Sequence, residues 1–212
     1  MIAVLTGDLV NSTKMSDDTY SRIITHLQQL LLDVNKTYGA SGELYRGDEF
    51  QIHYPVPAHA LKSALLIKLS LHLSALSAKP IQCTLSLAYG SYNIYDNSPS
   101  TSSGAAYIAS GRGLEKTQRG ELSLHLQANN DHCEMKLLLQ FLNHLLNRLT
   151  KTQAELLYQY IENDFVDHKE MAKITGTTRQ NISNRLSNIG AFLVRDYMEI
   201  LNPKVEQLTG SN

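Results

Sequence analysis

Two aspartates stand where carboxylates on neighbouring strands could act together. Asp8 follows an apolar run at residues 2–6, and Asp48 lies in a tight turn between two short extended runs. The apolar run predicts a buried strand and the extended runs predict a hairpin. Carboxylates on adjacent strands can share hard cations that bridge phosphates. The alternative is that Asp8 and Asp48 are ordinary turn carboxylates that cap a helix and a hairpin.

A second group of polar side chains lies near the carboxyl end of the chain, on the helix expected at residues 178–189. Ile182 and Leu186 give this helix one apolar side, and no Asp or Glu occurs between Met171 and Gly190. Amide, hydroxyl and guanidinium groups of this kind bond base edges and phosphates when a helix enters the major groove of DNA. The candidate DNA-binding residues are Thr177, Thr178, Arg179, Gln180, Asn181, Ser183, Asn184 and Arg185. Two alternatives are a three-helix bundle whose polar face is merely hydrated and a helical module that binds protein.

The elements that must position these residues follow from the spacing of apolar side chains. In chain order we expect a strand at 2–6, a helix at 18–38, a hairpin at 43–54, a helix at 58–77, a strand at 81–89, a helix near 104–116 and a strand near 121–125. The order β-α-β-β-α-β-α-β predicts an α+β domain with a ferredoxin-like, palm-type antiparallel sheet and its helices on one face. A small polar stretch at 96–104 predicts an exposed loop.

The remainder of the chain is expected to be all helical. Residues 135–149 are leucine-rich almost all round, which predicts a helix buried on more than one side. Thr150 and Gln153 form a capping-box pattern at the start of the next helix. Further helices are expected at 153–162, 168–175, 178–189 and 191–201. We therefore divide the chain into a first domain at 1–134, a linker helix at 135–149 and a helical domain at 150–212.

Residues 168–186 resemble the helix-turn-helix of bacterial repressors. Ala172 is small where the two helices cross, and Gly176 can adopt the positive φ that the tight turn requires. Ile182 and Leu186 anchor the second helix to the core. The resemblance implies binding to double-stranded DNA. Since one subunit offers few phosphate contacts, we expect a homodimer that contacts two half-sites.

The first 125 residues resemble the class III nucleotidyl cyclases. Residues 6–13, Thr-Gly-Asp-Leu-Val-Asn-Ser-Thr, are similar to the first metal motif of that family, and Gly47-Asp48-Glu49-Phe50 to its second. Residues 103–107, 112–115 and 120–122 look like the late helix and the strand that follows it. Closer still is the SatD-like group, in which cyclase-like domains are attached to helix-turn-helix modules.

This resemblance implies a set of ligand-binding residues. Asp8 and Asp48 would hold Mg²⁺ or Mn²⁺ together with a nucleotide. The amino terminus of the helix after Asp8 would supply backbone N–H groups to phosphate oxygens. The expected phosphate or ligand contacts are Leu9, Asn11, Ser12, Thr13 and Arg112.

Two positions depart from the cyclase pattern. The base-selecting lysine of the family corresponds to Leu44, and the asparagine four residues before Arg112 corresponds to Ile108. Catalysis by this fold depends on several charge-stabilising groups at once, so their loss would cost several powers of ten in rate. We therefore expect a regulator whose cyclase-like domain binds a ligand or mediates dimerisation. The alternatives are an active nucleotidyl cyclase of unusual specificity with a DNA-binding tail, and, from the GGDEF-like residues 46–50, a diguanylate cyclase.

Composition limits the remaining classes of protein. The chain has 212 residues, 42% apolar and 18% charged, which is enough for two compact domains. Its net charge of −1 gives no bulk attraction to nucleic acid, so DNA binding depends on the motif. Cys83 and Cys133 form no C-x-x-C pair. The start of the chain has no basic leader and no apolar stretch is long enough for a membrane span, so we expect a cytoplasmic protein without a membrane partner.

Overall fold

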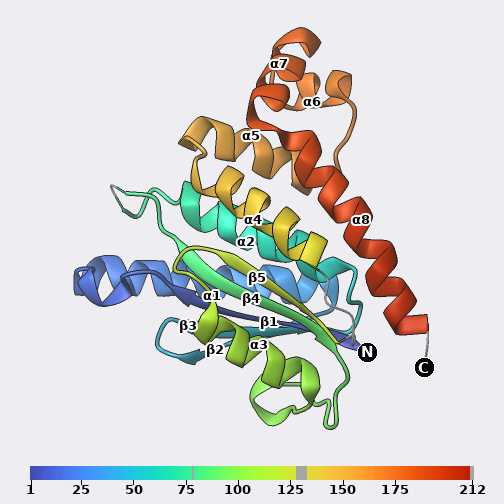
Figure 1. Ribbon diagram of the computed structural model, residues 1–212. Coiled ribbons are helices and arrows are strands. Elements are labelled where there is room, and N and C mark those ends of the chain that lie inside the picture. The colour runs from blue at the N-terminus through green and yellow to red at the C-terminus, as the bar shows by residue number, and fades with distance from the viewer. Residues whose placement is uncertain (78, 128–132, 211–212) are drawn as a thin grey trace.

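The computed structural model describes residues 1–77, 79–127 and 133–210. Within them, the sheet has five strands in the order β2-β3-β1-β4-β5, and helices flank it (Figure 1). The strands are β1 (Ile2–Leu9), β2 (Ser41–Arg46), β3 (Glu49–Tyr54), β4 (Cys83–Gly90) and β5 (Leu122–Leu126). The helices are α1 (Asp17–Tyr38), α2 (His59–Leu73), α3 (Ala105–Lys116), α4 (Cys133–Asn147), α5 (Lys151–Glu162), α6 (His168–Ile174), α7 (Arg179–Ile189) and α8 (Ala191–Gly210), with short 3₁₀ turns η1 (Ser12–Lys14) and η2 (Pro99–Thr101).

The sheet is mixed rather than wholly antiparallel. β1 lies at its centre and pairs antiparallel with both β3 and β4, and β2 pairs antiparallel with β3. β5 runs parallel to β4, which corrects the expected antiparallel arrangement at this edge. The physical reason is the connection, because α3 carries the chain back across the sheet before β5 begins and such a crossover joins parallel strands.

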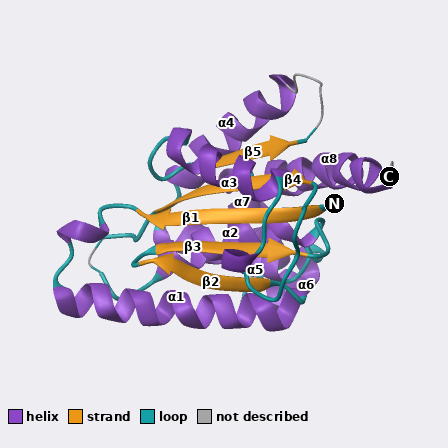
Figure 2. Ribbon diagram, turned by 90° about the horizontal axis from the view of Figure 1, so that it is seen from below, coloured by secondary structure: helices purple, strands orange, loops and turns teal. Residues whose placement is uncertain are grey.

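Helices cover both faces of the sheet, which corrects the expectation that they lie on one face. Ala3, Leu5 and Leu9 of β1 point into the main core together with buried residues of α1 and α2. Ile2 and Val4, on the alternate face of the same strand, pack with residues of α3. Figure 1 shows α2 and α3 on opposite sides of the sheet, and Figure 2 shows α1 running along β2. The face under α3 also carries the two aspartates described below.

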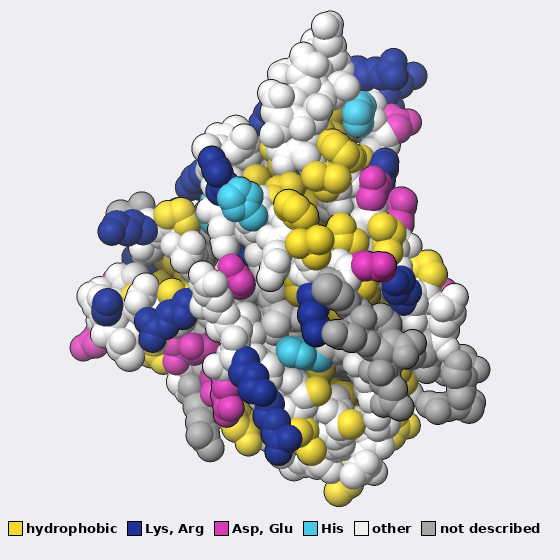
Figure 3. Space-filling view, in the orientation of Figure 1, with side chains coloured by type: hydrophobic (Ala, Val, Ile, Leu, Met, Phe, Trp, Pro, Cys, Tyr) yellow, Lys and Arg dark blue, Asp and Glu magenta, His cyan; other side chains and the backbone are white. Residues whose placement is uncertain are grey.

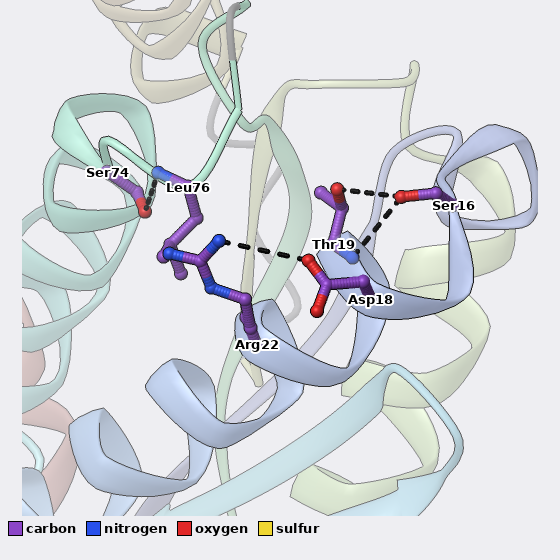
Figure 4. Close-up of polar contacts among 6 residues, drawn as sticks. All are labelled: Ser16, Asp18, Thr19, Arg22, Ser74 and Leu76. Carbon is purple, nitrogen blue, oxygen red and sulfur yellow. Dashed lines mark hydrogen bonds and ion pairs between the residues drawn. The ribbon is translucent and has the colours of Figure 1, made fainter.

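Local contacts fix the start of α1. The Ser16 side chain accepts a hydrogen bond from the backbone N–H of Thr19, and Asp18 pairs with Arg22 one turn along the helix (Figure 4). In the same view, the Ser74 hydroxyl accepts from the backbone N–H of Leu76 just after α2. A side-chain cap and acids in the first turn are what a helix amino terminus favours. α1 therefore begins at Asp17, with its apolar side held against the sheet.

The carboxyl-terminal helices share one core with the sheet. Buried residues of α4 to α8 belong to the same hydrophobic cluster as those of α1 and α2, and α5 packs against α2. The expected capping box of Thr150 and Gln153 at the start of α5 is confirmed. α8 continues past Pro203, beyond the end expected at residue 201. Among the described residues no helix is both long and apolar enough to cross a membrane. The division into domains at 134 and 149 stays a prediction.

Candidate functional site

Asp8 and Asp48 lie together at one end of the sheet. Asp8 is the seventh residue of β1 and lies opposite Glu49 of β3 in the register of the two strands. Asp48 precedes Glu49 in the β2–β3 turn. Gly47 in the same turn has a φ of 65°, a backbone angle that residues with a Cβ rarely adopt. The carboxyl groups of Asp8 and Asp48 are close enough for the charge of Asp48 and a shared proton to raise the pKa of Asp8. The structure therefore brings together the two carboxylates that the sequence singled out.

The electrostatics of this pair favour a shared proton or a cation. Burial raises the pKa of Asp8 to about 6, and the charge and hydrogen bond of Asp48 and the charge of Glu49 act in the same direction. The backbone N–H of Leu9 donates to the carboxyl group of Asp8 and offsets part of this rise. Burial, followed by the charge of Asp48, also raises the pKa of the Tyr20 hydroxyl on α1. Negative charge is thus concentrated at a site that is only partly open to water.

The donor set of this pair suits a hard divalent cation. Mg²⁺ is commonly held by one or two carboxylates and completes its shell with water and phosphate oxygens. Among the described residues there is no group of three or more His, Cys, Asp or Glu side chains arranged to hold a metal. Asp8 and Asp48 would therefore supply only part of a coordination shell, and the remaining ligands would come from solvent or from a phosphate-bearing molecule.

A cleft of about 660 Å³ lies between the sheet and α3, and Glu49, the strand partner of Asp8, lines it although Asp8 and Asp48 do not. Thr6, Tyr45, Glu49 and Gln51 line its floor from the sheet. Its other wall comes from the loop before α3 and from the first two turns of that helix, with Asn93, Pro99, Ser100, Ser102, Ser103, Gly104, Ala105, Tyr107, Ile108 and Gly111. The size and the mixture of hydroxyl, amide and apolar groups are those of a small-molecule site.

A directed chain of hydrogen bonds fixes the cleft floor to α3. Gln51 Nε2 donates to Thr6 Oγ1 at 3.0 Å, and Thr6 Oγ1 lies 2.6 Å from Ser110 Oγ. Ser110 Oγ in turn donates to the carbonyl of Ser86 at 2.9 Å. Because Ser110 uses its proton on the carbonyl, the Thr6 hydroxyl must donate to Ser110. These polar groups therefore hold α3 against the sheet together with the apolar contacts of Ile2 and Val4.

Glu43 anchors the loop that forms the outer wall of the cleft. Its carboxylate accepts from Ser98 Oγ at 2.8 Å and from the backbone N–H of Ser100 at 2.7 Å. Burial acts to raise the pKa of Glu43, but the hydrogen bonds from Ser100 and Ser98 outweigh it and lower the pKa. Sequence reasoning missed Glu43, although its place on the same strand face as Glu49 and Gln51 follows from the alternation of a β-hairpin.

The segment after Asp8 differs from the expectation that a helix begins there. Asn11 has a φ of 60°, η1 makes a single turn at Ser12–Lys14, and α1 starts only at Asp17. The first turn of α1 carries Asp17 and Asp18, which would repel phosphate. The helix amino terminus is therefore not next to Asp8. The candidate residues Asn11, Ser12 and Thr13 lie on an exposed or partly exposed turn, whereas the Leu9 side chain is buried and leaves only its backbone available.

The positions that depart from the cyclase pattern lie in different surroundings. Leu44 packs against the main core, while the neighbouring Tyr45 lines the cleft and is half exposed. Successive side chains of a strand point to opposite faces of the sheet, so Leu44 and Tyr45 lie on different sides of β2. Ile108 lines the cleft, and Arg112, one turn further along α3, is exposed and outside its lining. The base-selecting position expected at Leu44 therefore does not face the cleft.

α6 and α7 present the second group of candidate residues. Ala172, Ile182 and Leu186 are buried, and Gly176 has a φ of 65°, as the sequence predicts for this turn. Thr178 caps α7 by accepting from the backbone N–H of Asn181. Of the candidate DNA-binding residues, Thr178, Arg179, Gln180, Asn181 and Asn184 are exposed, and Thr177, Ser183 and Arg185 are partly exposed. The polar side of α7 is thus open to solvent, although Asn181 Nδ2 donates to Thr177 Oγ1 at 2.8 Å.

A cleft of about 560 Å³ adjoins the start of α7 and is lined by several cationic side chains. Lys169, Arg179 and Arg195 line it, with Asp167 and His168. Arg195 is occupied by Asp196 at 2.9 Å and Glu199 at 3.6 Å. Asp167 caps α6, and hydrogen bonds from the backbone N–H groups of Glu170 and Lys169 lower its pKa. Positive charge from Arg179 therefore extends from the polar side of α7 into this cleft.

No protein-family model matches the chain, and no curated protein sequence matches it either. Solved structures with a similar arrangement are guanylyl and adenylyl cyclase domains. The guanylyl cyclase Cya2 is 17% identical with a TM-score of 0.46, covering 58% of this chain and 73% of its own. The guanylate cyclase domain of RhGC from Catenaria anguillulae, solved in complex with GTP, is 16% identical with a TM-score of 0.45, covering 58% of this chain and 76% of its own. A bacterial light-regulated adenylyl cyclase is 14% identical with a TM-score of 0.43, covering 54% of this chain and 69% of its own.

Proposed function

We propose that this chain is a DNA-binding transcriptional regulator, in which α6 and α7 form a helix-turn-helix and the sheet domain is a nucleotidyl cyclase-like module. The module binds a metal with a nucleotide, or joins two subunits, and the regulator acts as a homodimer on double-stranded DNA. The observation that carries the proposal is the polar, solvent-exposed side of α7, which bears no carboxylate. The apolar side of α7 is anchored by Ile182, Leu186 and Ile189.

The side chains on this surface suit a major groove. Arg179 and Arg185 can form two parallel hydrogen bonds to a guanine, and Gln180 and Asn184 can do so to an adenine. α6 has Glu170, but that carboxylate is paired with Lys173 at 2.7 Å. Lys169 and Arg179 at the edge of α7 are placed to approach backbone phosphates. Base contacts and phosphate contacts would thus come from one continuous surface.

DNA binding can be tested without knowing the operator. Sequencing the DNA fragments that co-purify with the full chain would supply a binding site for fluorescence anisotropy. Arg179→Ala and Gln180→Ala should each weaken binding to that site by roughly 5- to 150-fold, since one bidentate base contact contributes about 1–3 kcal/mol. Arg22→Ala, which removes an equal charge from α1, is the matched control and should leave the affinity unchanged. Equal affinity for all four proteins would contradict the proposal.

In the sheet domain, the carboxylate pair and the cleft lined by Glu49 support ligand binding. Asp8 and Asp48 would hold Mg²⁺ or Mn²⁺, which supplies positive charge to the phosphates of a nucleotide when bound. Asn11, Ser12 and Thr13 follow Asp8 on the surface, and Arg112 lies exposed on α3. Leu44 and Ile108 offer no polar group for base selection or charge stabilisation, so we propose binding without efficient turnover. Isothermal titration with Mn²⁺ and a nucleoside triphosphate, repeated with Asp8→Asn, measures this directly.

The same cleft also favours a second candidate function, an active nucleotidyl cyclase of unusual specificity fused to a DNA-binding tail. The specific observation behind it is that Glu49, the strand partner of Asp8, lines a space large enough for a nucleotide. Incubation with each nucleoside triphosphate and Mn²⁺ or Mg²⁺ separates the two functions. A cyclic product whose formation is abolished by Asp8→Asn would establish the enzyme.

A further inference from the structure

α4 and α8 expose large apolar side chains that the rest of the described chain leaves uncovered. We call them the α4–α8 patch, and each is between 38% and 64% exposed. The members are Leu137, Leu138, Phe141, Phe192, Leu193 and Ile200. Figure 3 shows hydrophobic side chains gathered over the region where α4 and α8 run in Figure 1. Scattered single apolar residues are normal on a surface, but a gathering on two neighbouring helices indicates a binding surface.

The patch spans two helices that are in contact with each other. α4 and α8 pack against each other, and Leu145 and Leu193 both lie beside Gly190, 3.2 and 3.5 Å from the place of an added Cβ. Leu137 and Phe141 are one turn apart on α4, and Leu193 and Ile200 are two turns apart on α8. Side chains at these spacings share a face of their own helix, so each of the two packed helices carries one exposed apolar row.

The buried side of each helix already packs in the core of this subunit. α4 places Met135, Leu139, Leu142 and Leu146 in the core, and α8 places Val194, Tyr197, Met198, Leu201 and Val205 there. The leucine-rich sequence of α4 predicts burial on more than one side, and within the described residues only one side is covered. Among the described residues, the second side of α4 is therefore open to contact with a partner.

We propose that the α4–α8 patch is the docking surface for a second copy of this chain. The six side chains expose roughly 500 Å² of apolar surface, which, with a polar rim, approaches the ~800 Å² per partner of a stable interface. The rims are also complementary in charge. Counted with Arg148 just after its end, α4 carries Lys136 and Arg148 against Glu134, a net charge of +1. α8 carries three acids, Asp196, Glu199 and Glu206, against Arg195 and Lys204, a net charge of −1. In a two-fold dimer each α4 rim can meet the partner's α8 rim, and this contact occurs twice.

A dimer formed through the α4–α8 patch would also affect DNA binding. Only this effect on DNA binding rests on the proposed function. α8 begins one residue after α7 ends, with Gly190 between them. A dimer formed through α8 would therefore fix the distance and direction between the two α7 helices. Two half-sites about one helical turn apart need such a fixed spacing.

Sedimentation velocity of the full chain at micromolar concentration tests the interface. We expect a dimer for the natural chain and a monomer for Phe141→Glu and Leu193→Glu, with at least a tenfold rise in the dissociation constant because each change buries two carboxylates per dimer. Ile94→Glu changes an equally exposed residue on the loop across the sheet and should stay dimeric. Circular dichroism checks that each variant is folded, and these exposed positions are not needed for the core.

The possible outcomes decide between occupants of the patch. A natural chain that is monomeric at this concentration would overturn the proposal and leave the patch for another protein. If Ile94→Glu breaks the dimer and Phe141→Glu does not, the proposal is wrong and the subunits meet on the cleft side of the sheet. Arg179→Ala should remain dimeric, so a failure of DNA binding is separable from a failure of dimerisation.

Discussion

Replacing Asp8 by Asn should make the metal-free protein more stable at neutral pH. Asp8 has a pKa of about 6 against an ordinary value of 3.8 for its carboxyl group. A raised native pKa means that the folded state binds more protons than the unfolded chain between these two values. The contribution of Asp8 to the free energy of unfolding is therefore most favourable below pH 3.8 and is lost as the pH rises to 6. Above pH 6 the folded protein contains a carboxylate that is disfavoured by burial and by Asp48.

The size of the effect follows from the pKa difference. In full it corresponds to about 3 kcal/mol, and solvent screening at this partly exposed site reduces it to about 1–2 kcal/mol. Asp8→Asn removes the charge but keeps an oxygen that can accept from the Leu9 N–H. We expect the variant to melt a few degrees higher at pH 7, since about 1 kcal/mol shifts the melting temperature of a chain of this size by roughly 2–4 °C.

Thermal unfolding with EDTA between pH 3.5 and 7.5 measures this difference. The gap between Asp8→Asn and the natural chain should be near zero at the lowest pH, should open as the pH rises from 3.8 to about 6, and should stay constant above that. Asp18→Asn is the control, because it removes an exposed carboxylate that favours the start of α1 and pairs with Arg22. That change should lower stability slightly. An Asp8→Asn variant no more stable than the natural chain at pH 7, or a gap independent of pH, would refute the electrostatic argument.

Three further changes can be followed by chemical or thermal unfolding. Gly113→Ala places a Cβ 2.3 Å from His125 Nε2 and should lower the free energy of unfolding by about 1–3 kcal/mol. Gly111→Ala in the same helix meets no atom and should raise the free energy of unfolding by about 0.5–1 kcal/mol. A larger cost for Gly111→Ala than for Gly113→Ala would contradict the packing of α3. Asn143→Ala leaves the backbone of Leu122 without its two buried partners, each at 2.8 Å, and should cost about 2–4 kcal/mol. Thr150→Ala removes the cap of α5 and should cost about 1 kcal/mol, and no change would mean that the capping box is weak.

Most helices and strands could be predicted because their apolar side chains repeat at a clear period. The helix expected at 18–38 is α1 at 17–38, and the capping pattern at Thr150 places the start of α5. The end of α8 could not be placed, since Pro203 is a signal for termination. The structure keeps the helix going because Leu201 and Val205, on either side of that proline, are both buried.

Prediction of the site was less complete, because it depends on which strands become neighbours. The pairing of Asp8 with Asp48 follows from strand ends and a hairpin, both visible in the sequence. The place of α3 over Thr6 depends on a crossover to a parallel β5, for which local sequence gives no signal. Tyr45 faces the cleft because it lies two residues after Glu43 on the same strand, and the alternation of a β-strand predicts that face once the hairpin is placed.

If a ligand at Asp8 and Asp48 changes the position of α7, side-chain packing must carry the change. The ion pair between Lys62 and Asp164, which joins the sheet domain to the helices that follow it, is too weak to do so. Lys62 of α2 pairs with Asp164 after α5, but the Asp164 side chain is 83% exposed. Exposed pairs of this kind contribute little. β1, α2, α5 and α7 instead all place buried side chains in one hydrophobic cluster, and α5 packs against both α2 and α7. A ligand that moved the end of β1 would have to shift α2 against α5, because closely packed interiors transmit displacement rather than absorb it.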